Sequence, residues 1–257
     1  TSVLRGLAET KTLTPKEEET MVFNVLRGGL NFGLREALAD AYDWNNHGSA
    51  FISAQRARVS KGSEHWHITE SHYKKVYMPK IATVALGDVV ATGTSLQHAI
   101  NELISSVQKN NSQLNNIVFF TIGGKRSEEI IEAADLKCRE IFPNYEKSIV
   151  IYFEGCFEVA NLDTDLIIKI TGTDLLRLDS VMAPEFIEAQ YESLSYPIER
   201  CTIYDAGSRA FWLQEYNEDL REYWESVLHL ADSGISYFEL LDKIDFKKLI
   251  VLFRETD

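Results

Sequence analysis

Residues 83–100 read TVALGDVVATGTSLQHAI, and this stretch decides the fold. An apolar, β-branched run reaches Asp88, a small polar turn follows at 91–95, and apolar residues then recur at helical spacing. A strand that passes through a tight turn into a helix is the repeating unit of a parallel α/β sheet. We therefore expect a strand over 81–86 and a helix over 95–107.

The same alternation of strand and helix patterns recurs through the first 153 residues. Further strands are expected over 21–26, 50–54, 117–122 and 148–153, and Ser127 is expected to cap a helix that reaches residue 141. The predicted fold class is therefore α/β, with a mostly parallel central sheet flanked by helices on both faces. Beyond residue 155 we expect a short strand over 166–170, a helix over 211–230 and a last helix over 238–244.

The composition limits the function classes that remain. The chain of 257 residues has a formal net charge of -13 and contains no long Lys/Arg run, so we expect no nucleic-acid partner. The longest apolar runs are too short for a membrane span, and residues 1–12 lack the apolar core of a secretory leader. Cys138, Cys156 and Cys201 are far apart in the sequence, so we expect reduced thiols and a cytoplasmic location.

The turn at 91–95 has the composition of an anion site. Backbone N–H groups at the start of a helix attract anions, and Thr92, Thr94 and Ser95 add hydroxyl donors. Gly93 allows a close approach of the backbone or a positive φ. Asp88 would repel phosphate but accepts hydrogen bonds from sugar hydroxyls. A ribose carrying phosphate groups therefore fits the combination of Asp88 and the turn at 91–95.

Two common phosphate binders are disfavoured by the same residues. The turn lacks the Gly-Lys-Ser/Thr ending of a nucleotide P-loop, and it lacks the three-glycine dinucleotide pattern. An ordinary turn that begins a helix and binds nothing remains the alternative.

VALGDVVATGTSL resembles the phosphoribosyl-diphosphate (PRPP) binding loop of type I phosphoribosyltransferases. Many members of that family carry two adjacent acids before the loop, and here Gly87 takes the place of the first. The resemblance implies a phosphoribosyltransferase-like fold with a small hood, a catalytic role for Asp88, and Mg²⁺ held by Asp88 directly or through water. It assigns PRPP binding to Asp88, Val89, Val90, Ala91, Thr92, Gly93, Thr94 and Ser95.

Two upstream segments resemble further parts of that family. LRGGL at 26–30 is similar to its pyrophosphate loop, which implies that Arg27, Gly28 and Gly29 bind diphosphate. The polar segment 56–79 lies where the family has a flexible catalytic loop, and it is long enough to be a lid or to hold a small hairpin. There Arg56, Arg58 and Lys61 would contact diphosphate, with Arg27 and Arg56 counted as catalytic.

The segment HWHITESH has a second interpretation. His65, His67, Glu70 and His72 are residue types that bind zinc at short spacings, so a metal cluster is the alternative to a polar lid.

IYDAGSR at 203–209 resembles the motif that lines the base pocket in the uracil branch of the family. It implies that Tyr204, Asp205, Ala206 and Gly207 bind the base, while Ser208 stands where the family has its final acid. A plain Asp-Gly turn is the alternative.

Together these resemblances imply an enzyme of nucleotide salvage that transfers ribose 5-phosphate from PRPP to a base, with a pyrimidine such as uracil favoured. The implied organisation is an N-terminal extension (1–19), a phosphoribosyltransferase-like domain (20–210, with a hood over about 155–205) and a C-terminal helical extension (211–257). A homodimer or higher homo-oligomer is expected. Two alternatives stay open: a non-catalytic PRPP or nucleotide sensor of the same fold, and an interaction protein that binds a partner through its acidic, aromatic C-terminal region.

Overall fold

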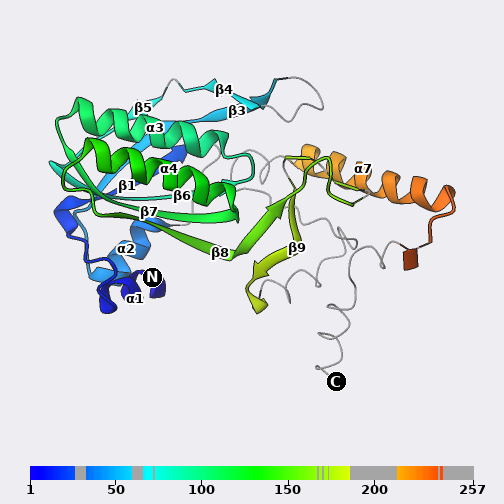
Figure 1. The fold of residues 1–257 in the computed structure, drawn as a ribbon, viewed down its shortest axis with the longest axis horizontal. Helices are drawn as coiled ribbons and strands as arrows, with labels where there is room; N and C mark the ends of the chain where they lie inside the picture. The colour runs from blue at the N-terminus through cyan, green and yellow to red at the C-terminus, as the bar shows by residue number, and fades with distance from the viewer. Residues whose placement is uncertain are drawn as a thin grey trace.

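A seven-stranded sheet forms the centre of the computed structural model (Figure 1). The structure describes residues 1–26, 33–59, 66–71, 73–166, 168–169, 171–172, 174–185, 213–236 and 238–239. The strand order is β5-β2-β1-β6-β7-β8-β9. The strands are β1 (Thr20–Leu26), β2 (Gly48–Ser53), β5 (Lys74–Lys75), β6 (Ile81–Val90), β7 (Gln113–Gly124), β8 (Lys147–Val159) and β9 (Leu175–Met182).

The five inner strands of this sheet are parallel. β1 pairs with β2 and β6, β6 pairs with β7, and β7 pairs with β8, all in parallel register. β5 and β9 are antiparallel strands at the two edges. The predicted α/β class with a mostly parallel sheet is confirmed, and the sheet is mixed because of its edge strands.

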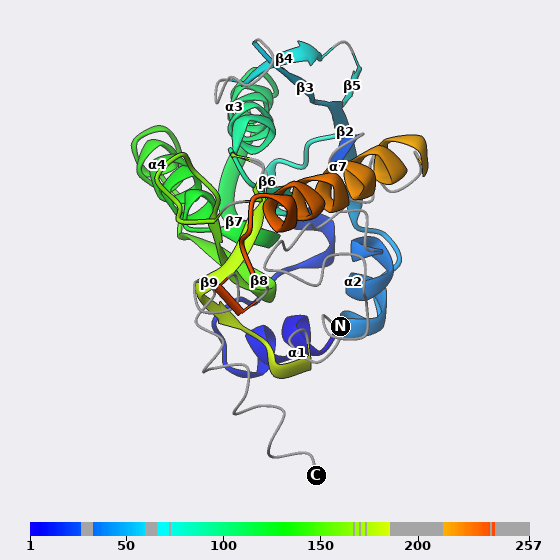
Figure 2. The ribbon, with the colours of Figure 1, turned by 90° about the vertical axis from the view of Figure 1, so that its right-hand side faces the viewer.

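Helices cover both faces of the sheet. They are α1 (Ser2–Glu9), α2 (Leu34–Tyr42), α3 (Thr94–Lys109) and α4 (Arg126–Ile141), with a single 3-10 turn, η1 (Glu17–Glu19), before β1. α1 and α2 lie on one face, and α3 and α4 lie on the other (Figure 2). This division follows from right-handed crossovers, because α2 leads from β1 to β2 whereas α3 and α4 lead in the opposite direction along the sheet.

Two buried cores result, one on each face. The larger core packs the apolar stripe of α3, which includes Leu96, Ile100 and Leu103, against inner strands. The smaller core packs α1 and α2 against the other face. Side chains alternate between faces along β6: Leu86 belongs to the larger core and Ala85 to the smaller one. By the same alternation, Gly87 lies on the α2 face and Asp88 on the α3 face.

The N-terminal residues pack on the same body. Leu4 and Leu13 are buried in the smaller core, and the Tyr42 hydroxyl donates a hydrogen bond to the carbonyl oxygen of Leu4 at 2.6 Å. α1 therefore covers part of the sheet face that α2 leaves open.

For segment 56–79 the sequence left open a lid or a small hairpin, and the structure contains a hairpin there. β3 (Gln55–Arg58) and β4 (Trp66–Glu70) pair in antiparallel fashion as a separate two-stranded sheet. The hairpin lies near α3, beyond the edge of the central sheet (Figure 1).

Several sequence expectations about element bounds were wrong. β6, β7 and β8 extend beyond the predicted strands, because the residues after the apolar runs still find ladder partners. Ser127 is not a cap: α4 begins at Arg126 after Lys125, and no side-chain hydrogen bond caps it. Residues 166, 168 and 169 of the expected strand over 166–170 lie outside any strand.

α7 (Leu213–Asp232) confirms the expected aromatic helix. Tyr223 is buried beside Ile168 and Val227, whereas Trp224 is 46% exposed and meets the Tyr223 ring edge-on at 5.7 Å. Of these two aromatic residues of α7, Tyr223 therefore belongs to the core and Trp224 to the surface. Among the described helices, none has the length and apolar character needed to cross a membrane.

His47 provides a test of this packing. It is 8% exposed, and its two ring nitrogens have no hydrogen-bond partner among the described residues. Burial lowers its pKa below the ordinary value of 6.5; the nearby Arg35 charge also lowers it, while Glu17 and Glu36 act in the opposite direction. His47 therefore binds a proton more tightly in the unfolded chain than in the folded one. The free energy of unfolding consequently decreases as the pH falls below about 6.5.

We expect His47→Gln to reduce the loss of unfolding free energy between pH 7.5 and pH 5.5, measured by urea denaturation at several pH values. The wild type measured over the same pH values is the reference. An unchanged slope in His47→Gln would contradict the burial argument.

Candidate functional site

The candidate site lies where the order in which successive strands are added to the sheet reverses its direction. From β1 the chain moves through α2 to β2 on one side, and from β6 it moves through α3 to β7 on the other. β1 and β6 are neighbours and parallel, their pairing ends at Phe23 and Leu86, and the two connections diverge beyond the carboxyl ends of the strands. Open α/β sheets bind ligands in the crevice at such a point.

The turn after β6 has the geometry that the sequence predicted. Gly93 adopts φ 78° and ψ 3° and is the N-cap of α3, which begins at Thr94. The backbone N–H of Gln97 donates to the carbonyl oxygen of Gly93 at 2.8 Å and closes the first helical turn. Of the two roles that the sequence allowed for Gly93, a close approach of the backbone or a positive φ, the positive φ is present.

Gly93 is also pressed against a neighbouring helix. A Cβ atom at this position would lie 2.3 Å from Cδ1 of Ile130 and 3.2 Å from Cγ of Arg126, both on α4. A side chain at residue 93 would therefore require Ile130 and Arg126 to shift, in addition to adopting the positive φ.

The first turn of α3 retains its capacity for an anion. Among the described residues no side chain caps it, and the turn itself contains no acidic residue. The hydroxyl oxygens of Thr92 and Thr94 lie 3.2 Å apart, and both side chains are half-buried. Unsatisfied N–H groups, a helix dipole and adjacent hydroxyls are the chemistry of phosphate binding.

Asp88 lies elsewhere than the sequence predicted. The strand does not end at Asp88, because Val89 and Val90 still pair with β7, and Asp88 is 1% exposed. Its backbone oxygen accepts a hydrogen bond from the Thr121 hydroxyl at 2.9 Å. By strand alternation its side chain lies on the α3 face, so a sugar would reach it only after the groups that cover it move.

Ser95 joins the turn to the base of the β3–β4 hairpin. Its hydroxyl is 3.5 Å from the carbonyl oxygen of Ala54, which immediately precedes β3. Ser53 and Tyr73 close the base of the segment through backbone and hydroxyl hydrogen bonds of 2.9 and 3.0 Å. On the exit side, Lys74 pairs with Glu102 of α3 at 2.6 Å and lowers the pKa of that carboxyl. Both ends of the candidate lid are thus attached to the body that carries the turn.

Several predicted site residues cannot be placed. Outside the described residues lie Arg27, Gly28, Gly29, Lys61, Tyr204, Asp205, Ala206, Gly207, His65 and His72. The backbones of Arg56 and Arg58 lie in β3. Within the described part of the chain, no three His, Cys, Asp or Glu side chains gather as a metal cluster. Cys138 and Cys156 are free thiols there, as expected.

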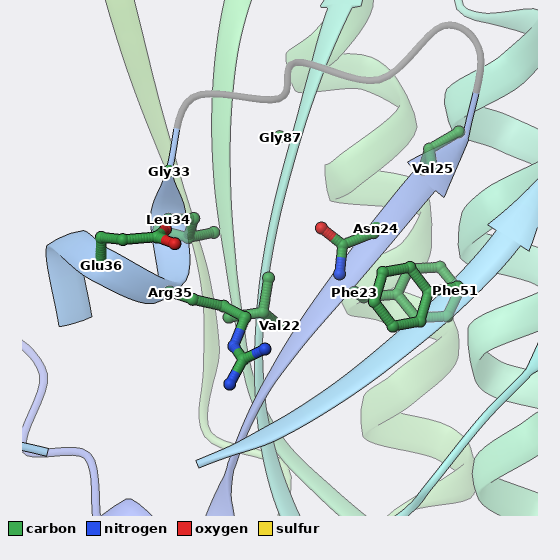
Figure 3. Close-up of a pocket in the computed structure, with 10 residues that line it drawn as sticks. All are labelled: Val22, Phe23, Asn24, Val25, Gly33, Leu34, Arg35, Glu36, Phe51 and Gly87. Carbon is green, nitrogen blue, oxygen red and sulfur yellow. The ribbon is translucent and has the colours of Figure 1, made fainter. Parts of the chain in front are cut away.

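Sequence reasoning missed two features, one beside the turn and one on the other face of the sheet. Arg126, at the start of α4, lies next to Gly93 and pairs with Glu129 at 2.6 Å. A cavity of about 360 Å³ lies between α2 and the sheet, and Asn24 contributes to its lining (Figure 3). The available signal was Asn24 itself, an amide within the otherwise apolar strand TMVFNVL.

The comparisons with known proteins give no family assignment. No protein-family model matches this chain, and no curated protein matches it.

Gly93→Ala tests the geometry of the turn. The substitution combines a strained positive φ with the overlap against Ile130, so we expect a loss of unfolding free energy of about 1–3 kcal/mol in urea denaturation. The matched control is Gly234→Ala, where φ is 89° but nothing lies within 4 Å of the added Cβ. Equal losses in the two variants would show that the contact with α4 contributes nothing.

Proposed function

We propose that this protein is a phosphoribosyltransferase that transfers ribose 5-phosphate from PRPP to a nitrogenous base and releases diphosphate. The observation that carries the proposal is the start of α3, which follows Thr92 and Gly93 and has no side-chain cap among the described residues, at the point where the strand order reverses. A phosphorylated sugar fits this position because its phosphate can bind the helix start while its ring extends along the carboxyl ends of the strands.

In this proposal the 5′-phosphate accepts hydrogen bonds from the N–H groups of the first turn of α3 and from the hydroxyls of Thr92 and Thr94. Charged acceptors strengthen such bonds. The Asp88 carboxylate orients the ribose by accepting from its hydroxyls, once the side chain becomes accessible.

The reaction breaks the bond between ribose C1 and a diphosphate oxygen and forms a bond from C1 to a ring nitrogen of the base, which loses its proton. The transition state has oxocarbenium character, so positioning and stabilisation of the leaving group provide the catalysis. Arg27, Gly28, Gly29, Arg56, Arg58 and Lys61 are the proposed diphosphate ligands.

The absence of a three-ligand cluster among the described residues fits Mg²⁺ that arrives with its substrate. Mg²⁺ is commonly bound by one or two carboxylates together with substrate phosphates, and Asp88 is the proposed protein contact. Bound Mg²⁺ would neutralise charge on the diphosphate. The β3–β4 hairpin, tied at its base to the turn, would exclude water from the reacting carbon.

A second candidate is a non-catalytic protein of the same fold that binds PRPP or a nucleotide as a signal. It is favoured by the burial of Asp88 and by Gly87, which leaves a single carboxylate at this place. Turnover separates the two candidates, because a sensor binds the ligand without releasing diphosphate.

The decisive assay measures diphosphate release from PRPP and Mg²⁺ across a panel of bases, with the wild type and Asp88→Asn. We expect release that depends on a base and falls at least about 100-fold in the variant, because the carboxylate orients the reacting ribose. Binding of PRPP without release for any base would support the sensor, and absence of binding would refute both candidates.

The hydroxyl of Thr94 allows a separate test of phosphate binding. Thr94→Val keeps the shape but removes a donor to a charged group, so the Kd for PRPP measured by calorimetry should rise about tenfold or more. Thr10→Val, at the end of α1, is the matched control and should leave the Kd unchanged. An unaltered Kd in Thr94→Val would place the phosphate elsewhere.

A further inference from the structure

The outward face of α7 carries a row of apolar side chains, which we call the α7 stripe: Leu213, Leu220, Trp224 and Leu228. At 100° per residue these side chains fall within an arc of about 80°, which also contains Asn217, and they extend over roughly 22 Å of helix. Leu213, Trp224 and Leu228 are exposed, and Leu220 is half-buried. Scattered exposed apolar residues are ordinary on protein surfaces, whereas a row of them along one helix face is typical of an interaction site.

The buried face of α7 fixes the direction in which the stripe points. Tyr223 is 1% exposed and packs in a small core with Ile168 and Val227. Its ring meets the Trp224 ring edge-on at 5.7 Å, which orients the exposed indole. α7 lies beyond β8 and β9 and extends away from the central sheet (Figure 1). The stripe is therefore presented outward on a helix that is anchored from behind.

Acidic side chains line one flank of the stripe. They recur every seven residues, so helical spacing places them on the same side, and they are Glu218, Glu225 and Asp232. All three are exposed, and among the described residues none of them forms an ion pair. α7 as a whole contains six acidic residues and a single Arg221, so its charge is strongly negative.

An apolar row beside an acidic flank fits a basic amphipathic helix. Such a helix can lay its own apolar residues along the stripe while its Lys or Arg side chains face the carboxylates, and opposite charges across an interface favour the encounter. A second copy of this chain fits less well, because each copy brings the same acidic flank and a formal net charge of -13. The charge pattern therefore selects a basic partner over self-association.

We propose that the α7 stripe is a docking surface for a basic amphipathic helix of a partner protein. The apolar face of the partner packs along Leu213, Trp224 and Leu228, and its Lys or Arg side chains pair with Glu225 and Asp232. Trp224 is the anchor, because a few large aromatic side chains contribute most of the binding energy at such interfaces. This docking does not depend on the proposed transfer reaction.

The test measures the binding of a labelled helical peptide of about 18 residues, long enough to cover the stripe, to the full chain by fluorescence anisotropy. The probe carries leucines at i, i+3, i+4 and i+7 on one face and lysines on the other. In the first control peptide, glutamates replace the lysines. In the second, the same residues are permuted so that the leucines no longer share a face.

Three variants alter the stripe or its flank: Trp224→Ala, Leu228→Ala and Glu225→Lys. Two matched controls lie on α4. Leu136→Ala removes a leucine that is 62% exposed, against 61% for Leu228, and Glu132→Lys makes the same change in net charge as Glu225→Lys.

We expect the probe to bind the wild type, with a Kd that rises with salt because charge pairs contribute. The Kd should rise about tenfold or more in Trp224→Ala and severalfold in Leu228→Ala and Glu225→Lys. Both α4 controls should match the wild type. If Trp224→Ala does not fold, the exposed Leu228→Ala carries the test.

Three results would overturn the inference: no binding of the probe to the wild type, equal binding of either control peptide, or an unchanged Kd in the α7 variants that fold. Light scattering adds a fourth. Wild-type dimers that dissociate in Leu228→Ala would assign the stripe to a second copy of the chain instead of a basic partner.

Discussion

The parallel pairing of β1 with β6 is the constraint on which the rest of the structure depends. Residues 20–23 align with residues 83–86, so two strands far apart in the sequence end side by side. Their onward connections must then leave in opposite directions, with α2 on one face and α3 on the other. The position of the half-buried start of α3 and the cavity beside α2 both follow from this one pairing.

Close packing surrounds the turn after β6. Gly93 combines a left-handed backbone with a close approach to the side chain of Ile130, which would have to shift to admit a Cβ atom. Ser95 connects the same turn to Ala54 at the base of the hairpin. The turn is therefore in direct contact with both α4 and the base of the hairpin.

The two faces of β6 carry different groups. Asp88 points to the α3 face together with Leu86, and Gly87 points to the α2 face together with Ala85. A single strand thus presents a buried carboxylate on one face and a glycine that lines the α2 cavity on the other, at neighbouring residues.

The sequence by itself determined the α/β class, the order of the inner elements and the positive φ of Gly93, because apolar periodicity and glycine chemistry are local properties. It placed Asp88 at a strand end, and this was wrong, because the ladder to β7 extends β6 through Val90. Only the tertiary structure decided that Asp88 is buried, and only it brought Asn24, Phe51 and Arg35 around one cavity. Pairing register and crossover direction are set by contacts between distant residues, which no local pattern encodes.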